Sequence, residues 1–579
     1  MISLQPAAKK KSFLHSQRRA EFWLLAVLFL VALCVQLIAV RRTLNVYDES
    51  LSLYGADRVL HGEVPYRDFW TMYGPAQFYL LAGFFKLFGV SALVGRIYDA
   101  LIRSGIACVC FVLVGRLSNR RYAALAFAAA LLWLTCIDIP AYNFPAFPAL
   151  LVSLISCLFL SRYLRDPSRS LPLFISGALV GVTVSFRHDS GFYLCVAQAI
   201  TLAWSTVSSR APDASPLRAL FNLRRPAILY LAGILTIALP LLLFLLWKVP
   251  VHDLFYDLFY VPGKIYPKVR RLPFEGFDAL RHLRSPFRWE GRAVLEQSIV
   301  FFPVLVCLAA LASLSSSREP SRRLFDHPWQ RYTFALLTLL GSLFFIKGLI
   351  RVSPLQMMQS ILVGAILIAV LLSRISRLNT VTSLFVGACA FYFIACTSPL
   401  LVDYVMFTRT NLSDLRHPEV PRSLYRTCHP PAGLERARCL IVNPDAAAAI
   451  QEIERRTSPT DRIFVGDGRH DKLFWNDVRL YFASGRASVT KWHDLHPGVQ
   501  TTLPIQNEIT ESIRHNSPKL IVLNSTWDDT SEPNDSRYSS GVTALDDYIR
   551  DHYVPQSHLG NITILVPNEA APNNAVKSK

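Results

Sequence analysis

Long apolar blocks alternate with short polar connections over the first 400 residues of the chain. About eleven blocks can be placed, and each approximates the length that crosses the hydrocarbon core of a bilayer. They cover residues 22–40, 98–116, 122–138, 143–161, 171–186, 190–207, 226–247, 297–314, 332–347, 354–373 and 380–398. This pattern predicts a polytopic α-helical membrane protein with about 11 transmembrane helices.

Composition and charge agree with this prediction. Of the 579 residues, 52% are hydrophobic and 17% are charged, whereas about a quarter of a soluble chain is charged. The net charge of +19 comes largely from arginines that concentrate in alternate connections, as in cytoplasmic loops. The positive charge is therefore explained by the membrane topology of the chain, and no nucleic-acid partner is predicted. It predicts a cytoplasmic N-terminus and a C-terminal segment on the outer face.

The composition changes after residue 399. We expect a membrane domain at 1–399, a Pro-rich linker at 400–440 and a periplasmic α/β domain at 441–579. Residues 462–465, 519–523 and 562–566 read as strands, and 445–456 and 506–514 read as helices. Cys428 and Cys439 lie in the polar linker and form a plausible disulfide in an oxidising compartment.

The first outer loop, 41–97, begins with two adjacent carboxylates, Asp48 and Glu49, just beyond the first apolar block. Residues 48–60 suit an amphipathic helix. Residues 76–88 are strongly apolar but short for a span, which favours an interfacial or re-entrant helix. Two such helices beside a carboxylate pair would form a roof or a lateral entrance for a lipid.

Cationic side chains are predicted near the same membrane face. Arg187, His188 and Asp189 lie at one outer helix junction, and Lys347 and Arg351 lie at another. Arg187 could pair with Asp189 to hold a turn, or it could bind phosphate oxygens with its planar fork. The outer loop 248–296 is also basic, and it is either an anion site or a solvated loop.

Carboxylates and cations on one membrane face suit sugar transfer from a lipid phosphate. A carboxylate takes the proton of the acceptor hydroxyl, and cations neutralise the departing phosphate. The histidines are scattered without ligand spacing, so no metal site is predicted, although a divalent cation at Asp48 or Glu49 stays open. Two alternatives also stay open: a transporter or flippase for lipid-linked sugars, and a non-catalytic structural component of an envelope complex.

The first outer loop resembles that of bacterial GT-C membrane glycosyltransferases. The likeness lies in Asp48-Glu49, in HGEVPYRDF at 61–69 and in the segments 54–56, 73–75 and 87–89, with 481–486 in the tail. The protein mannosyltransferase, aminoarabinose transferase and lipopolysaccharide-core transferase types are the most similar. Aminoarabinose transferases have a Lys-Pro-Pro motif in the first outer loop, where this chain has Tyr73-Gly74-Pro75. Arg351 is followed by Val352-Ser353, where some relatives have Arg-x-Asp.

The resemblance implies an inverting transfer of a monosaccharide on the outer face of the bacterial inner membrane. The donor would be a polyprenyl-phosphate sugar, and the acceptor a glycan, a lipid or a protein. Asp48 would be the catalytic base with Glu49 beside it, and the donor phosphate would fall to Arg187, Arg351 and Lys347. We expect the remaining outer-face residues to support the site, namely Tyr66, Arg67, Asp68, Tyr73, His188 and Asp189.

Overall fold

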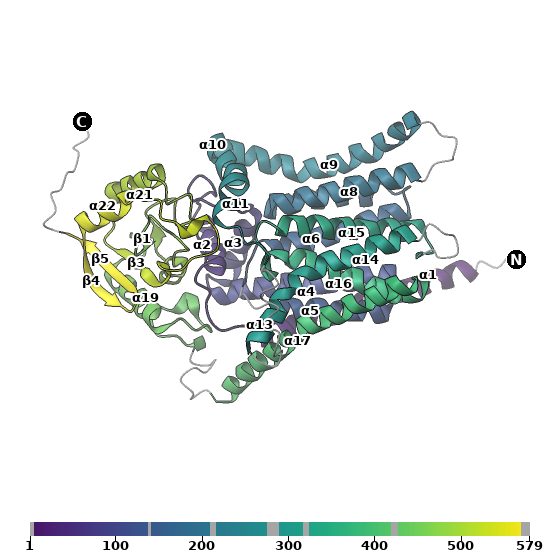
Figure 1. Cartoon of the computed structure of the whole chain (residues 1–579), viewed down its shortest axis with the longest axis horizontal. Helices are drawn as coiled ribbons and strands as arrows, with labels where there is room; N and C mark the ends of the chain where they lie inside the picture. The colour runs from purple at the N-terminus through teal and green to yellow at the C-terminus, as the bar shows by residue number, and fades with distance from the viewer. Residues whose placement is uncertain are drawn as a thin grey trace.

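A bundle of long, nearly parallel helices and a small α/β domain at one end of it make up the protein (Figure 1). The computed structural model describes residues 5–136, 141–208, 216–274, 289–316, 324–417 and 427–568. Within these ranges, eight helices are long and apolar enough to cross a membrane. The chain is therefore a polytopic helical membrane protein, as its hydropathy pattern predicts.

Each predicted span is a helix of the bundle. The helices are α1 (Gln5–Ile38), α4 (Ala92–Leu117), α5 (Arg120–Cys136), α6 (Ala146–Arg165), α7 (Leu171–Phe186), α8 (His188–Ser208), α9 (Pro216–Lys248), α14 (Phe302–Ser316), α15 (Pro328–Gly348), α16 (Pro354–Ser373) and α17 (Thr380–Arg416). The block at 297–314 also includes the end of α13 (Trp289–Ser298) and a 3-10 turn, Ile299–Phe301.

Small residues allow the helices to approach one another closely. A Cβ atom at Gly177 of α7 would lie 2.1 Å from the Tyr230 carbonyl oxygen of α9. A Cβ atom at Gly233 of α9 would lie 2.2 Å from the Phe174 carbonyl oxygen of α7. In a membrane, where apolar burial between helices gains little, such close packing is a main source of association energy.

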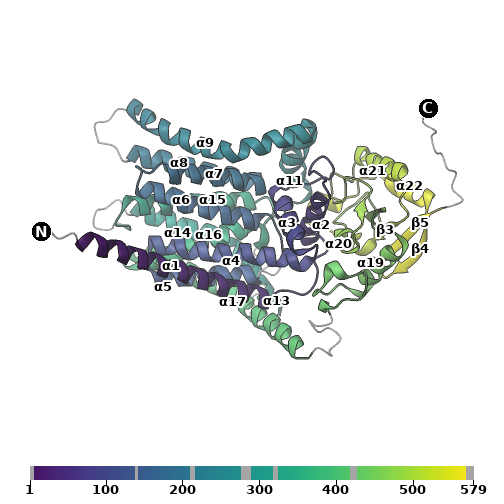
Figure 2. The ribbon, with the colours of Figure 1, turned by 180° about the vertical axis from the view of Figure 1, so that it is seen from behind.

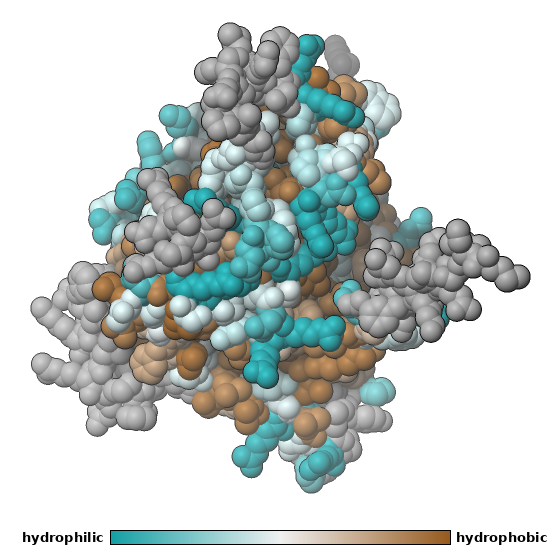
Figure 3. All heavy atoms as spheres, turned by 90° about the vertical axis from the view of Figure 1, so that its right-hand side faces the viewer, coloured by the Kyte–Doolittle hydropathy of each residue, from teal (hydrophilic) through white to brown (hydrophobic). Residues whose placement is uncertain are grey.

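The arginine-rich connections meet at the end of the bundle remote from the α/β domain. Among the described residues this end carries Arg116, Arg120, Arg121, Arg162, Arg165, Arg169, Arg224, Arg225, Arg331, Arg374 and Arg377. Figure 3 looks onto this end, where hydrophilic surface runs across the face beside apolar surface. The basic residues are thus segregated at one end of the bundle, as the alternation of basic connections predicts.

The last helix of the bundle extends beyond residue 399, where the membrane domain is predicted to end. Helix α17 continues past Pro399 to Arg416. Residues 400–407, which follow Pro399, are mostly apolar, so the apolar pattern itself continues beyond 398. The part of the linker at 418–426 lies outside the described residues. Beyond it, Cys428 and Cys439 form the predicted disulfide.

The C-terminal domain contains a five-stranded mixed sheet in the order β2-β1-β3-β5-β4. Strand β1 (Arg462–Asp467) pairs in parallel with β2 (Ala487–Ser488) and β3 (Ile521–Asn524), while β5 (Ile562–Pro567) is antiparallel to β3 and β4 (Tyr553–Leu559). The three predicted strands are β1, β3 and β5. The helices are α19 (Pro444–Arg456), α20 (Val478–Ser484), α21 (Leu503–Asn516) and α22 (Ala544–His552).

Two helices of the first outer loop lie between the bundle and this domain (Figure 2). They are α2 (Asp48–Leu60) and α3 (Ala76–Phe88), at the predicted positions. One apolar cluster joins Leu53 of α2 and Phe85 of α3 to Ile450, Ile463 and Phe482 of the C-terminal domain. The first outer loop and the C-terminal domain therefore pack as one unit against the bundle.

Candidate functional site

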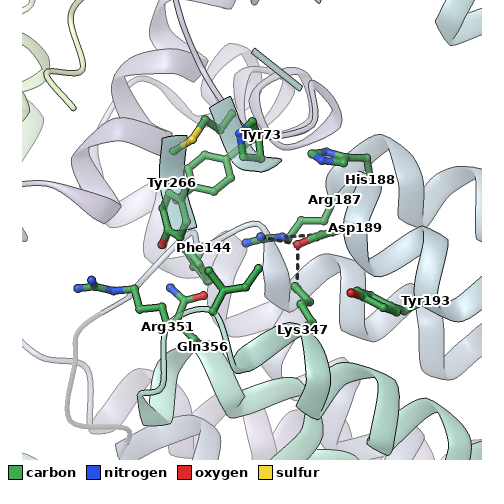
Figure 4. Close-up of a pocket in the computed structure, with 13 residues that line it drawn as sticks. Tyr73, Phe144, Arg187, His188, Asp189, Tyr193, Tyr266, Lys347, Arg351 and Gln356 are labelled. Atoms are coloured by element: carbon green, nitrogen blue, oxygen red, sulfur yellow. Dashed lines mark hydrogen bonds and ion pairs between the residues drawn. The ribbon is translucent and has the colours of Figure 1, made fainter. Parts of the chain in front are cut away.

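A cavity of about 170 Å³ opens at the end of the bundle that faces the C-terminal domain. Its walls come from the ends of α7, α8, α15 and α16, from the first outer loop and from the segment around Tyr266 (Figure 4). The lining residues combine cations with aromatic rings: Met72, Tyr73, Phe144, Arg187, His188, Asp189, Tyr193, Pro262, Tyr266, Lys347, Ile350, Arg351 and Gln356.

Arg187, Asp189 and Lys347 form one ionic cluster in the cavity wall (Figure 4). The Nε and Nη2 groups of Arg187 donate to the two carboxylate oxygens of Asp189 at 3.0 and 2.8 Å. Lys347 Nζ lies 3.4 Å from Asp189 Oδ2. This geometry is compatible with both roles predicted for Arg187, which are to hold a turn with Asp189 and to bind phosphate oxygens. Its Nη1 group has no hydrogen-bond partner among the described residues and is available for a phosphate.

Arg351 belongs to a second cluster that spans the two domains. Its Nη1 and Nη2 groups donate to the carboxylate of Glu532 at 2.7 and 2.6 Å, and Nη1 also donates to the Arg270 carbonyl oxygen at 2.9 Å. The Arg270 guanidinium lies 3.8 Å from Glu532. In each cluster two basic side chains face one carboxylate, Arg187 and Lys347 around Asp189, and Arg351 and Arg270 around Glu532. The cavity is therefore suited to an anion.

The first outer loop reaches this cavity through Gly74. The Gly74 amide donates to the Phe186 carbonyl oxygen at 3.1 Å, and a Cβ atom there would lie 2.2 Å from the Ser185 carbonyl oxygen. This close approach, which a side chain would block, brings the Tyr73 ring to 5.7 Å from the Arg187 guanidinium. Tyr73 thus forms part of the cavity wall through a cation–π contact.

Asp48 is the first residue of α2 and is partly buried. Across the described part of the chain, its carboxylate has neither a hydrogen-bond donor nor an ion-pair partner within contact distance. Burial raises the pKa of Asp48, while the charges of Arg351 and Arg270 act in the opposite direction. An unpaired carboxylate with a raised pKa, within electrostatic reach of the cavity arginines, has the properties of a general base.

The C-terminal domain contacts Tyr47, the residue before Asp48, and in this way covers Asp48. The Tyr47 hydroxyl donates to Asp494 Oδ1 at 2.6 Å, and the Tyr47 ring stacks on Trp475 with centroids 5.7 Å apart. Burial raises the pKa of Asp494 to about 7, although the Tyr47 hydrogen bond and the Arg270 charge lower it. Asp494, whose pKa lies near neutral pH, is therefore within electrostatic reach of Asp48.

Glu49 has a different environment from its neighbour. Its two carboxylate oxygens accept from Arg96 Nε and Nη2 at 2.7 and 2.8 Å, and both side chains are 0% exposed. Arg96 also donates to the carbonyl oxygens of Arg41 and Thr43. The pair fixes the start of α2 against α4. The Glu49 carboxylate is thus held in a buried ion pair beside Asp48, and its predicted catalytic role stays a prediction.

We expect Glu49→Gln to destabilise the protein by about 3–5 kcal/mol, because it leaves the buried Arg96 charge uncompensated. The thermal midpoint of the detergent-solubilised variant measures this loss. The control is Glu511→Gln, since Glu511 pairs with Arg514 at an exposed site on α21. Equal midpoints for the two variants would contradict the role of the buried pair.

The other predicted supporting residues brace the first outer loop or lie at the cavity rim. The buried Tyr66 has a positive φ of 72° and donates its hydroxyl to the Tyr73 carbonyl oxygen at 2.7 Å. Arg67 donates twice to Asp68, which also accepts from the Val64 amide at 2.7 Å. These three residues shape the loop away from the cavity. His188 lines the cavity itself.

No group of three or more metal-binding side chains occurs within the described ranges. A divalent cation at Asp48 or Glu49 stays a prediction. Of the basic outer loop 248–296, the structure describes 248–274 and the backbone from 289, and it places Arg270 beside the cavity. The predicted basic residues Arg281, Arg284 and Arg288 lie outside the described residues.

Sequence reasoning missed the contribution of the C-terminal domain. Glu532 and Asp494 come from loops of that domain with no motif around them, and Tyr266 and Gln356 carry no separate signal either. The only available signal for Arg270 was the excess of basic residues on a face where topology disfavours them.

Residues 73–247 match the family model described as dolichyl-phosphate-mannose-protein mannosyltransferase. No curated protein matches the chain. The fold is similar to that of ArnT from Cupriavidus metallidurans bound to undecaprenyl phosphate, with a TM-score of 0.53 and 15% identity over 94% of this chain and 99% of that chain.

The apo state of the same ArnT gives a TM-score of 0.53 and 14% identity, over 94% of this chain and 98% of that one. The protein thus has the fold of the GT-C superfamily of membrane glycosyltransferases. Within that superfamily, its matched segment resembles the protein mannosyltransferase type.

Proposed function

We propose that the protein is an inverting glycosyltransferase that moves a monosaccharide from a polyprenyl-phosphate donor to an envelope acceptor. The observation that carries this proposal is the partly buried carboxylate of Asp48, which no described residue pairs, near a cavity where two basic side chains face each of two carboxylates. The ArnT of the same fold binds undecaprenyl phosphate, which is the type of lipid carrier that the proposal requires.

The reaction is a single displacement. Asp48 takes the proton of the acceptor hydroxyl, whose oxygen attacks the anomeric carbon of the donor from the face opposite the phosphate. The new glycosidic bond forms while the bond from the anomeric carbon to the phosphate oxygen breaks, which inverts the configuration. The lipid phosphate leaves with that electron pair and gains one negative charge.

The cations of the cavity stabilise this developing charge. A lipid-phosphate sugar carries one negative charge before transfer, and the released lipid phosphate carries up to two. Arg187 offers its Nη1 group, which donates to no described residue, and the Lys347 amine lies 3.4 Å from the shared carboxylate of Asp189. Preorganised cations around a leaving group lower the barrier because they need no reorganisation during the reaction.

The proposed orientation places the cavity and the C-terminal domain on the outer face of the bacterial inner membrane. The basic end of the bundle would then face the cytoplasm, in agreement with the tendency of arginine-rich connections to stay inside. The disulfide between Cys428 and Cys439 supports an oxidising compartment for the domain end of the bundle.

A single-turnover assay tests the function. Purified protein in liposomes is mixed with radiolabelled polyprenyl-phosphate sugars and cell-envelope fractions. We expect the label to move from the lipid into a glycan, lipid or protein fraction. Label that crosses the bilayer while still attached to its lipid would indicate a flippase instead, and label that does neither would favour a structural component.

The pH dependence of transfer follows from the pKa of Asp48. Asp48 acts as a base only when deprotonated, and burial raises its pKa, so kcat/KM should fall as the pH drops through that raised pKa. Arg351→Gln removes a charge that lowers the pKa, so it should move the acid limb to higher pH. Arg377→Gln at the opposite end of the bundle is the control. An acid limb at the same pH in all three proteins would contradict this electrostatic assignment.

A further inference from the structure

The only ion pair that directly joins a cavity-lining residue to the C-terminal domain, among the described residues, is the one between Arg351 and Glu532. Glu532 lies in the loop between the 3-10 turns Ser525–Trp527 and Asp535–Arg537. Burial raises the pKa of Glu532, but the hydrogen bond and charge of Arg351 outweigh it, so the pKa lies below its usual value. Glu532 therefore faces Arg351 as a carboxylate.

The direction of the Arg351 side chain is unusual for a donor ligand. Arg187, Asp189 and Lys347 converge on the cavity, whereas the Arg351 guanidinium points away from them, toward the C-terminal domain (Figure 4). Both terminal nitrogens of Arg351 are bound to Glu532. The two terminal nitrogens of Arg351 would match two phosphate oxygens well, but in this state the Glu532 carboxylate occupies them.

The surroundings give Glu532 an alternative partner when Arg351 leaves. Asn534 Nδ2 donates to Glu532 Oε2 at 2.9 Å and to the Arg271 carbonyl oxygen at 3.1 Å, and the Arg270 guanidinium lies 3.8 Å from the same carboxylate. Release of Arg351 therefore does not strand an unpaired carboxylate. That reduces the cost of the exchange, because a carboxylate left without partners is expensive at a partly buried site.

We propose that Glu532 is a positioning residue that competes with the donor phosphate for Arg351. Without donor, Glu532 holds Arg351 turned out of the cavity. A bound lipid phosphate takes over the two terminal nitrogens of Arg351, so the loop around Glu532, residues 528–541, loses its ion pair with Arg351 while the contacts with Arg270 and Arg271 remain. The inference rests on the proposed function, because it requires that Arg351 binds the donor phosphate.

The competition between Glu532 and the lipid phosphate predicts the direction in which the dissociation constant of the phosphate changes. When only a fraction of the molecules has a free Arg351, the apparent dissociation constant rises by the inverse of that fraction. Removing the Glu532 charge should therefore tighten phosphate binding. If Glu532 occupies Arg351 in about nine molecules of ten, the gain is about tenfold.

The test compares Glu532→Gln and Glu532→Ala with the wild-type full-length chain in detergent micelles. Undecaprenyl phosphate is the probe, and its dissociation constant is measured by tryptophan fluorescence. The matched control is Glu452→Gln, because Glu452 pairs with Arg455 and Arg456 of its own helix. We expect about tenfold tighter binding in both Glu532 variants and wild-type binding in the control.

A second measurement separates competition from a structural effect. Undecaprenyl phosphate should speed amide hydrogen exchange at residues 528–541 of the wild-type chain, whereas the Glu532 variants should exchange fast there without lipid. Adding Arg351→Gln to Glu532→Gln should cancel the gain in affinity, since the two residues act through one contact.

Two failures are distinguishable. Unchanged or weaker binding in folded Glu532 variants, with normal wild-type binding and transfer, would overturn the competition and leave the proposed function intact. A wild-type chain that neither binds undecaprenyl phosphate nor transfers sugar would overturn both proposals.

Discussion

Asp48→Asn should lower the transfer rate by about 10²- to 10⁴-fold, the usual contribution of a general base. The amide keeps the shape of the side chain but cannot take the proton of the acceptor hydroxyl. The Asp48 carboxylate makes no hydrogen bond or ion pair with any other described residue, so the substitution should leave the folded protein intact. Single-turnover transfer, normalised to the amount of folded protein, measures the effect.

The design of this experiment separates catalysis from stability. Asp461→Asn changes an aspartate that pairs with Lys519 at the surface of the C-terminal domain, and it should transfer sugar at the wild-type rate. Undecaprenyl phosphate should still bind to Asp48→Asn, since the cavity cations are unchanged. Full transfer activity in Asp48→Asn would exclude Asp48 as the base.

Arg187→Gln should reduce kcat by roughly 10²- to 10³-fold, the typical cost of losing one preorganised donor to a developing anion. The Michaelis constant for the donor should rise as well, because the same group binds the phosphate before transfer. Asp189 keeps Lys347 and the Ser190 amide as partners, so the bundle should still fold. Steady-state kinetics at varied donor concentration separate the two constants.

Arg169→Gln provides the matched comparison for Arg187. Arg169 also pairs with a nearby aspartate, Asp166, but its side chain is 77% exposed and it lies at the opposite end of the bundle. Its kinetic constants should equal those of the wild type. A normal kcat in folded Arg187→Gln would show that Arg187 only holds the turn with Asp189. That structural role is the alternative that the sequence also predicts.

The parts of the fold that depend on local patterns could be predicted from the sequence. The bilayer imposes a length and an apolarity on each span, so the helices of the bundle follow from hydropathy. Helices α2 and α3 also match their predicted bounds, because their amphipathic and apolar patterns are strong. The last predicted span, 380–398, is too short, because the mostly apolar residues 400–407 extend the same helix, which ends at Arg416.

The parts of the site that depend on distant contacts could not be predicted. Asp48 and Glu49 are adjacent and chemically alike, yet only Glu49 meets an arginine, Arg96, 47 positions along the chain. Glu532 lies 181 residues after Arg351. Such pairings are decided by how the elements pack, and no residue pattern near either partner indicates them.

The contact between Tyr47 and Asp494 joins residues separated by 447 positions. During synthesis the membrane helices and the first outer loop emerge before the C-terminal domain, and domains generally fold in that order. The cover over Asp48 can therefore form only after nearly the whole chain has been made. A nascent chain whose helices already form the cavity in the membrane would still lack the contact between Tyr47 and Asp494. Transfer activity should therefore appear only with the completed protein.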